Sequence, residues 1–220
     1  MNYFSLCLYF VFFLYVSLAA KAQSSNATND PDTDFKLAKE LYQKEQFSLA
    51  YPLFKSLFTE DNSSGIPVSI QTESKYYAIV CGLRLNDATT ENAAMEFIAL
   101  EHNEPRTEMM CYHLGEYYYK KLAFADAVSY YERTSPDNLS NTEIANMKYH
   151  QGYAYFTMQR FSDAKALLDA IRQMPADPNY ADANYYYGFI LFGEKKYKEA
   201  LAAFTVTENN PTYKGIVPYY

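Results

Sequence analysis

The sequence predicts an all-α protein, a solenoid built from successive helix–turn–helix hairpins. The first observation is a repeat: Gly115, Gly152 and Gly188 lie 37 and 36 residues apart, and each is followed by the same order of residue types. A fixed period of roughly 20–50 residues is typical of solenoids, in which each unit buries its apolar face only against its neighbours. The second observation is that no stretch of alternating apolar and polar residues predicts a strand.

Fixed offsets within each period predict the two helices of a hairpin. The glycine and a large residue three positions later share one face of a first helix. After a turn come an aromatic residue, then a small alanine, then a large apolar residue on one face of a second helix. These positions are held by Gly115, Tyr118, Phe124, Ala127 and Tyr131; by Gly152, Tyr155, Phe161, Ala164 and Leu168; and by Gly188, Leu191, Tyr197, Ala200 and Phe204. The small residues let the paired helices approach closely.

Two weaker copies of the pattern precede these three. The first keeps the spacing with Ala38, Leu41, Phe47, Ala50 and Phe54. In the second, around residues 78–97, the alanine and large apolar positions must shift to Ala93 and Phe97. We therefore expect about five hairpins over residues 34–208, of which the second is degenerate.

The pattern resembles the tetratricopeptide repeat (TPR) family, whose small, aromatic, alanine and large apolar positions match the three best copies one by one. The resemblance covers roughly residues 34–208 and implies a right-handed superhelical solenoid of TPR-like hairpins. The chain departs from the family in having no Trp: Cys111, Lys148 and Asn184 occupy the place where Trp is frequent. Together with the N-terminal segment described next, which predicts export, these repeats make the chain similar to large TPR-containing envelope proteins of Gram-negative bacteria.

The N-terminal segment predicts export. Residues 3–20 are rich in Phe, Leu and Tyr and carry no charge, and Ala20 and Ala22 place small residues where a signal peptidase reads them. We interpret residues 1–22 as a secretory signal peptide; the alternative is an uncleaved membrane anchor. Residues 23–33 are polar and aperiodic, which predicts a disordered leader. The expected location is the periplasm or the outer membrane.

The C-terminal residues are expected to begin a further repeat. Residues 209–220 follow the last complete hairpin, and the next small position would fall near residue 224 if the period continued. This predicts an incomplete repeat, and with it a chain cut from a longer protein.

Composition and motifs argue against several classes of function. The chain has a net charge of −7 and no basic stripe, which disfavours nucleic acid as a partner. No phosphate-binding loop, nucleophile elbow or zinc-protease motif occurs, so we expect no enzyme, no cofactor and no small-molecule substrate. Cys81 and Cys111 are expected to be buried as small apolar residues. His113 and His150 recur two residues before the repeat glycine, but about 10 Å apart and without a third ligand, which disfavours a metal site.

The tyrosines provide the candidate binding site. In the resembled family, three first-helix positions line the concave face: three residues before, one after and four after the repeat glycine. Here they are held by Tyr112, Tyr149 and Tyr185; by Glu116, Tyr153 and Phe189; and by Tyr119, Phe156 and Phe192. The resemblance thus implies an aromatic concave face with one acidic interruption, suited to a peptide carrying Lys or Arg. The alternative is that these rings only pack between adjacent hairpins.

Three hypotheses of function follow. The first is a non-enzymatic scaffold that binds a peptide or protein segment on the concave aromatic face, within an envelope complex. The second is a structural spacer or self-assembly module of a longer repeat protein. The third is a repeat region attached to a separate functional domain beyond residue 220.

Overall fold

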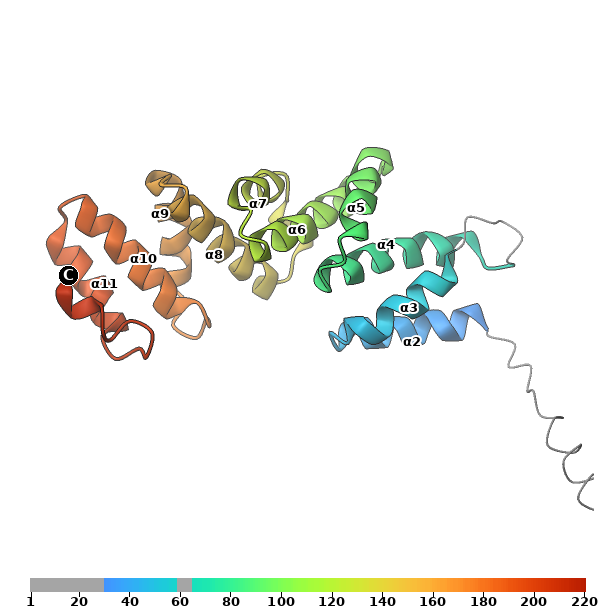
Figure 1. Cartoon of the computed structure of the whole chain (residues 1–220), viewed down its shortest axis with the longest axis horizontal. Helices are drawn as coiled ribbons and strands as arrows, with labels where there is room; N and C mark the ends of the chain where they lie inside the picture. The colour runs from blue at the N-terminus through green and yellow to red at the C-terminus, as the bar shows by residue number, and fades with distance from the viewer. Residues whose placement is uncertain (1–29, 59–64) are drawn as a thin grey trace, which may run out of the picture.

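The computed structural model describes residues 30–58 and 65–220, and this part of the chain contains helices, turns and loops but no strand. Its helices pack in successive hairpins that form an elongated row (Figure 1). The helices are α2 (Pro31–Gln43), α3 (Phe47–Leu57), α4 (Val68–Arg84), α5 (Thr89–Leu100), α6 (Glu104–Lys120), α7 (Phe124–Tyr131), α8 (Asn141–Thr157), α9 (Phe161–Arg172), α10 (Tyr180–Gly193) and α11 (Tyr197–Thr207), with short 3₁₀ turns η2 (Pro136–Asn138) and η3 (Val217–Tyr219). The predicted all-α TPR-like solenoid is confirmed.

Each hairpin turn contains one non-glycine residue in the left-handed region, with φ between 56° and 62°. These residues are Glu45, Asn86, Leu122, Gln159 and Lys195. The residue after each one donates its N–H to a carbonyl five residues earlier, as from Arg160 to Tyr155 at 2.8 Å. This bond closes the first helix in the manner of a Schellman motif and sends the chain back along the second helix.

The predicted small-against-large packing is present in the three best hairpins. Ala127, Ala164 and Ala200 are fully buried, as expected for small residues between two helices. The large apolar residue of each second helix lies directly against the repeat glycine: a β-carbon added at Gly188 would lie 2.9 Å from the ring of Phe204. The absence of a side chain at the glycine therefore sets the distance between the paired helices.

The second hairpin departs from the others. Gly82 stands four residues before its turn residue, where the other hairpins have a large side chain, and Thr90 packs against it. Its second helix, α5, starts three residues after the turn residue instead of two. The expected alanine position, Ala93, is wrong: Ala94 is buried, while Ala93 is only partly buried. The buried residues of α5 are Thr90, Ala94 and Phe97, of which Phe97 is buried as expected.

The boundaries of the repeat region also differ from expectation. Residues 1–29, which include the expected signal peptide and most of the expected leader, lie outside the described residues. The last residues of that leader are helical, because Asp30 caps α2 by accepting from the Asp32 N–H and the Thr33 hydroxyl. None of the helices in the described part of the chain is both long and apolar enough to cross a bilayer.

Residues 209–220 form turns and η3, where the sequence predicted the beginning of an α-helix. Gly215 and Pro218 explain the difference, since glycine weakens a helix and proline removes a backbone donor. Tyr213 and Val217 are nevertheless buried against α10 and α11. The segment therefore packs onto the last hairpin without forming a helix of its own.

Candidate functional site

The first helices α6, α8 and α10 carry a continuous row of aromatic rings. Neighbouring ring centroids lie 6.1 Å apart for Tyr119 and Tyr153, 5.0 Å for Tyr153 and Tyr186, and 4.9 Å for Tyr186 and Phe156. Phe156 then meets Phe189 at 5.6 Å. All five rings are partly exposed, so this aromatic row presents apolar surface along three successive hairpins.

Two of the predicted binding tyrosines are not part of that surface. Tyr112 is 1% exposed and Tyr149 is 7% exposed, so neither ring offers contact area to a partner. Tyr112 belongs to a buried cluster with Tyr131 and Met147 from the adjoining helices. Tyr149 donates its hydroxyl to Asp182 of the next hairpin at 3.3 Å. The position three residues before the glycine is a packing position in these two hairpins, which corrects the expectation for Tyr112 and Tyr149.

Glu116, the predicted acidic interruption, is also buried, with 5% exposure. Its Oε1 accepts from the Tyr131 hydroxyl at 2.8 Å and lies 2.8 Å from Nδ1 of His150, which must donate because a carboxylate has no proton to give. Burial acts to raise the pKa of the Glu116 carboxyl, but the bonds from His150 and Tyr131 and the charge of Arg84 hold it below its usual value. Because this charge is already compensated inside the fold, it cannot select a cationic ligand.

His150 links Glu116 to the aromatic row. Its ring stacks on Tyr119 with centroids 4.0 Å apart and planes 20° apart. His113, at the equivalent place in the preceding hairpin, is instead enclosed within the protein. Among the described residues, no group of three or more His, Cys, Asp or Glu side chains is placed to hold a metal.

Three of the remaining predicted residues, Phe156, Tyr185 and Phe189, line a groove at the C-terminal end of the row. It has a volume of about 570 Å³ and lies between α8, the start of α9, α10 and the segment after α11. Its lining residues are Phe156, Thr157, Gln159, Phe161, Tyr185, Tyr186, Phe189, Tyr213 and Ile216. None of them carries a formal charge, although the chain as a whole is acidic. The groove therefore suits apolar and aromatic side chains.

A carboxylate holds Tyr213, which forms one wall of the groove, in place. The Tyr213 hydroxyl donates to Asp182 Oδ1 at 2.8 Å, and its ring stacks on Tyr185 with centroids 4.2 Å apart. Burial and the bond to Asp182 raise the pKa of Tyr213, so its hydroxyl remains a donor. Asp182 also receives the Tyr149 hydroxyl. One carboxylate thus joins α8, α10 and the segment that closes the groove.

The structure brings together three of the nine predicted residues: Phe156, Tyr185 and Phe189. Tyr119 and Tyr153 extend the row away from the groove, and Phe192 lies outside it, 37% exposed, against Tyr197 and Tyr220. Sequence reasoning missed Tyr186, although it occupies the same repeat place as His113 and His150. It also missed Phe161, which was expected to pack within its hairpin but is 40% exposed.

The fold and this surface define the class of the molecule: a helical-repeat protein whose first helices present a partly exposed aromatic face. Residues 149–213 match the family model described as Tetratricopeptide repeat, a segment that contains most of α8 and all of α9–α11. The predicted TPR repeats are confirmed for this region. Such repeats generally serve as non-enzymatic modules for protein–protein interaction. No curated protein and no solved structure matched the chain.

Proposed function

We propose that this chain is a protein-interaction scaffold that holds an apolar segment of a partner protein in the aromatic groove between α8 and α10. The observation that carries the proposal is the uncharged aromatic lining of a groove of about 570 Å³ on a strongly acidic chain. Aromatic side chains supply large contact areas with little loss of rotamer entropy, which favours their use in recognition. The segment recognised is expected to insert Phe, Tyr, Leu or Met side chains between Phe156 and Phe189.

We no longer expect the partner to be selected for carrying Lys or Arg. That expectation depended on Glu116 standing free beside Tyr112, and both side chains are buried. The groove itself has no carboxylate in its lining. We therefore infer recognition by apolar contact, supplemented by hydrogen bonds to Gln159, Thr157 and the tyrosine hydroxyls.

Two residues at the same repeat position provide a matched test. Phe161 lines the groove and contacts Phe156 edge-on, with centroids 5.6 Å apart. Tyr197 begins α11 in the same way and contacts Phe192 edge-on at 5.5 Å, but it does not line the groove. Both rings are well exposed, at 40% and 58%, so truncating either one should disturb folding little.

The experiment selects peptides from a displayed random library on the full chain and measures their affinities by calorimetry. We expect the selected peptides to be rich in aromatic and aliphatic residues. Phe161→Ala should weaken their binding by at least about fivefold, corresponding to about 1 kcal/mol, and Tyr197→Ala should leave it unchanged. Equal binding by wild type and Phe161→Ala would contradict the proposal, as would equal losses in the two variants.

We also propose that the scaffold works after export, in the periplasm or at the outer membrane as part of an envelope complex. The support is the uncharged apolar run over residues 3–20, followed by small residues at Ala20 and Ala22. Expression in a Gram-negative host followed by fractionation and N-terminal sequencing tests this. Mature protein beginning at Gln23 in the envelope fraction is the expected result, and unprocessed chain in the cytoplasm would refute it.

A further inference from the structure

His113 is an imidazole enclosed in the protein with nothing to bond to. The side chain lies on α6 and is 3% exposed, and neither ring nitrogen has a hydrogen-bond partner among the described residues. An imidazole always carries at least one N–H donor, and burying an unpaired polar group costs free energy. His150, at the same place in the next hairpin, has the Glu116 carboxylate as its partner.

The repeat register explains why the two histidines differ. Glu116, the partner of His150, stands six residues before the turn residue Leu122. The residue six positions before the turn residue Asn86 is Val80, which is fully buried. The hairpin that precedes His113 therefore presents an apolar side chain where the next one presents a carboxylate.

None of the charged or titratable groups that the described residues place around His113 forms a hydrogen bond to its ring. Tyr76 from α4 lies with its ring centroid 6.5 Å from that of His113, and Tyr112, on α6 itself, lies at 5.3 Å. Burial lowers the pKa of His113 to about 3, and the positive charge of Arg84 on α4 acts in the same direction. The closed structure thus keeps this histidine neutral well into the acid range.

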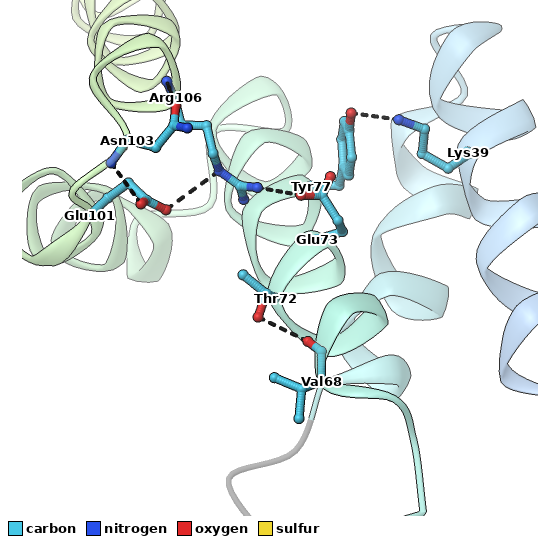
Figure 2. Close-up of polar contacts among 8 residues, drawn as sticks. All are labelled: Lys39, Val68, Thr72, Glu73, Tyr77, Glu101, Asn103 and Arg106. Carbon is cyan, nitrogen blue, oxygen red and sulfur yellow. Dashed lines mark hydrogen bonds and ion pairs between the residues drawn. The ribbon is translucent and has the colours of Figure 1, made fainter.

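Other features of the same contact region indicate imperfect packing. We call the interface between the α4–α5 hairpin and α6 the second joint. In residues 30–58 and 65–220, buried side-chain polar atoms without a hydrogen-bond partner occur only at Ser74, Arg106 and His113. Arg106 and His113 lie on one face of α6, whereas Ser74 lies on the face of α4 that carries Ala78 and Cys81. At the second joint Arg106 forms ion pairs with Glu73 of α4 and with Glu101 at the end of α5 (Figure 2). Ion pairs therefore bridge a joint whose interior leaves polar groups unsatisfied.

We propose that the second joint is an acid-sensitive hinge, opened when His113 takes up a proton. The closed joint cannot hold an imidazolium, because His113 is enclosed, has no hydrogen-bond partner among the described residues and already faces Arg84. In an open joint His113 is hydrated and titrates near its ordinary pKa of about 6.5. Linkage then requires the opening equilibrium constant to rise about tenfold between pH 7.5 and pH 5.5. Opening would separate the α4–α5 hairpin from α6 and change the curvature of the solenoid.

The next joint along the chain should not open in mild acid. There Nδ1 of His150 lies 2.8 Å from Oε1 of Glu116, so this histidine already has a carboxylate partner inside the fold. Mild acid should therefore leave the contact between α6 and α8 closed. The two joints differ because Val80 and Glu116 occupy the same repeat position, and only Glu116 has a carboxylate that can accept a hydrogen bond.

Hydrogen exchange of the full chain, read by mass spectrometry and corrected for the intrinsic effect of pH, tests the hinge. Between pH 7.5 and pH 5.5, where ordinary carboxyl groups stay ionised, we expect the opening constant to rise about tenfold in α4 and α5. Protection of α10 and α11 should not change. His113→Phe fills the same site with a ring that cannot titrate, and it should abolish the response. His150→Gln, which retains an N–H donor for Glu116, should leave the response in place.

Three results would overturn the proposal. One is an unchanged opening constant in the wild type, and another is an equal increase across all helices, which would mean global unfolding. The third is an acid response in His113→Phe that matches the wild type. If His113→Phe does not fold, His113→Gln removes the titration with a side chain of similar polarity and the same outcomes apply. The groove between α8 and α10 plays no part in this readout, so the result is independent of the proposed binding function.

Discussion

Tyr131 packs its ring directly against Gly115: a β-carbon added at Gly115 would lie 2.5 Å from Cε1 of that ring. The ring is itself held, since Tyr131 is 2% exposed and its hydroxyl donates to Glu116. Neither the ring nor the backbone of α6 has room to move away. We expect Gly115→Ala to lower the free energy of unfolding by about 1–3 kcal/mol, as overpacking does elsewhere, despite the better helix propensity of alanine.

Gly152→Ala is the matched control for this change. There an added β-carbon would lie 3.2 Å or more from Leu167 and Leu168, a tight but tolerable contact with flexible side chains. The gain of up to about 1 kcal/mol in helix propensity should roughly offset the crowding. Urea denaturation of the two variants measures the difference. Similar stabilities would show that Tyr131 does not set the spacing of its hairpin.

The alanine of each second helix gives an independent check of the packing. Ala164 is fully buried in the core between α8, α9 and α10. Ala164→Leu adds three carbon atoms to filled space and should cost about 1–3 kcal/mol of unfolding free energy. Ala166→Leu makes the same change on the exposed face of α9 and should be nearly neutral. A neutral Ala164→Leu would mean that the hairpin register is wrong.

The buried carboxylate of Glu116 should make stability depend on pH. Its pKa is lowered in the folded state, so the unfolded state takes up the proton first as the pH falls. The stabilisation is therefore fully present above about pH 4.5, the ordinary value, and is lost as the pH falls through the lower folded value. Glu116→Gln removes this titration and leaves imperfect partners for His150 and Tyr131, at a cost of about 1–3 kcal/mol at pH 7.

Unfolding curves collected from pH 7 to pH 3 check this prediction. The difference in stability between wild type and Glu116→Gln should shrink steadily below about pH 4.5. Glu108→Gln serves as a control, because that side chain is partly exposed and bonds to Asn138 near the surface. A constant difference across the whole pH range would show that folding does not shift the pKa of Glu116.

The sequence predicted the hairpins because the sizes of the residues at fixed repeat positions indicate which of them pack against each other. Glycine at one position and a large ring sixteen residues later specify close contact, as for Gly188 and Phe204. The conformation of the turn residues could not be predicted from residue type in this way. Leu122 and Gln159 adopt the left-handed conformation with side chains that carry no preference for it, because the Schellman bonds around them fix the chain.

The candidate site was harder to predict, because a tyrosine is equally suited to packing and to recognition. Whether its ring is exposed depends on the neighbouring hairpin. Tyr149 is covered because Asp182, 33 residues away, accepts its hydroxyl from the next first helix. The groove also depends on Tyr213 and Ile216, in a segment whose turn conformation the helical periodicity did not predict. Repeat position alone cannot carry that information.

Tyr149 gives the most direct test of whether the tyrosines bind a partner or only pack between adjacent hairpins. If the ring were part of a binding face, Tyr149→Ala would weaken partner capture and spare the fold. With 7% exposure and a contact to Asp182, the ring is part of the core between the fourth and fifth hairpins. We therefore expect Tyr149→Ala to lower the free energy of unfolding by about 3–5 kcal/mol, as truncation of buried aromatic residues does. Tyr149→Phe keeps the ring and loses only a long hydrogen bond, so it should cost about 1 kcal/mol or less. Chemical denaturation followed by circular dichroism measures the free energy of unfolding of both variants. A Tyr149→Ala variant as stable as wild type would show that the ring does not contribute to the core and would support its assignment to the binding face.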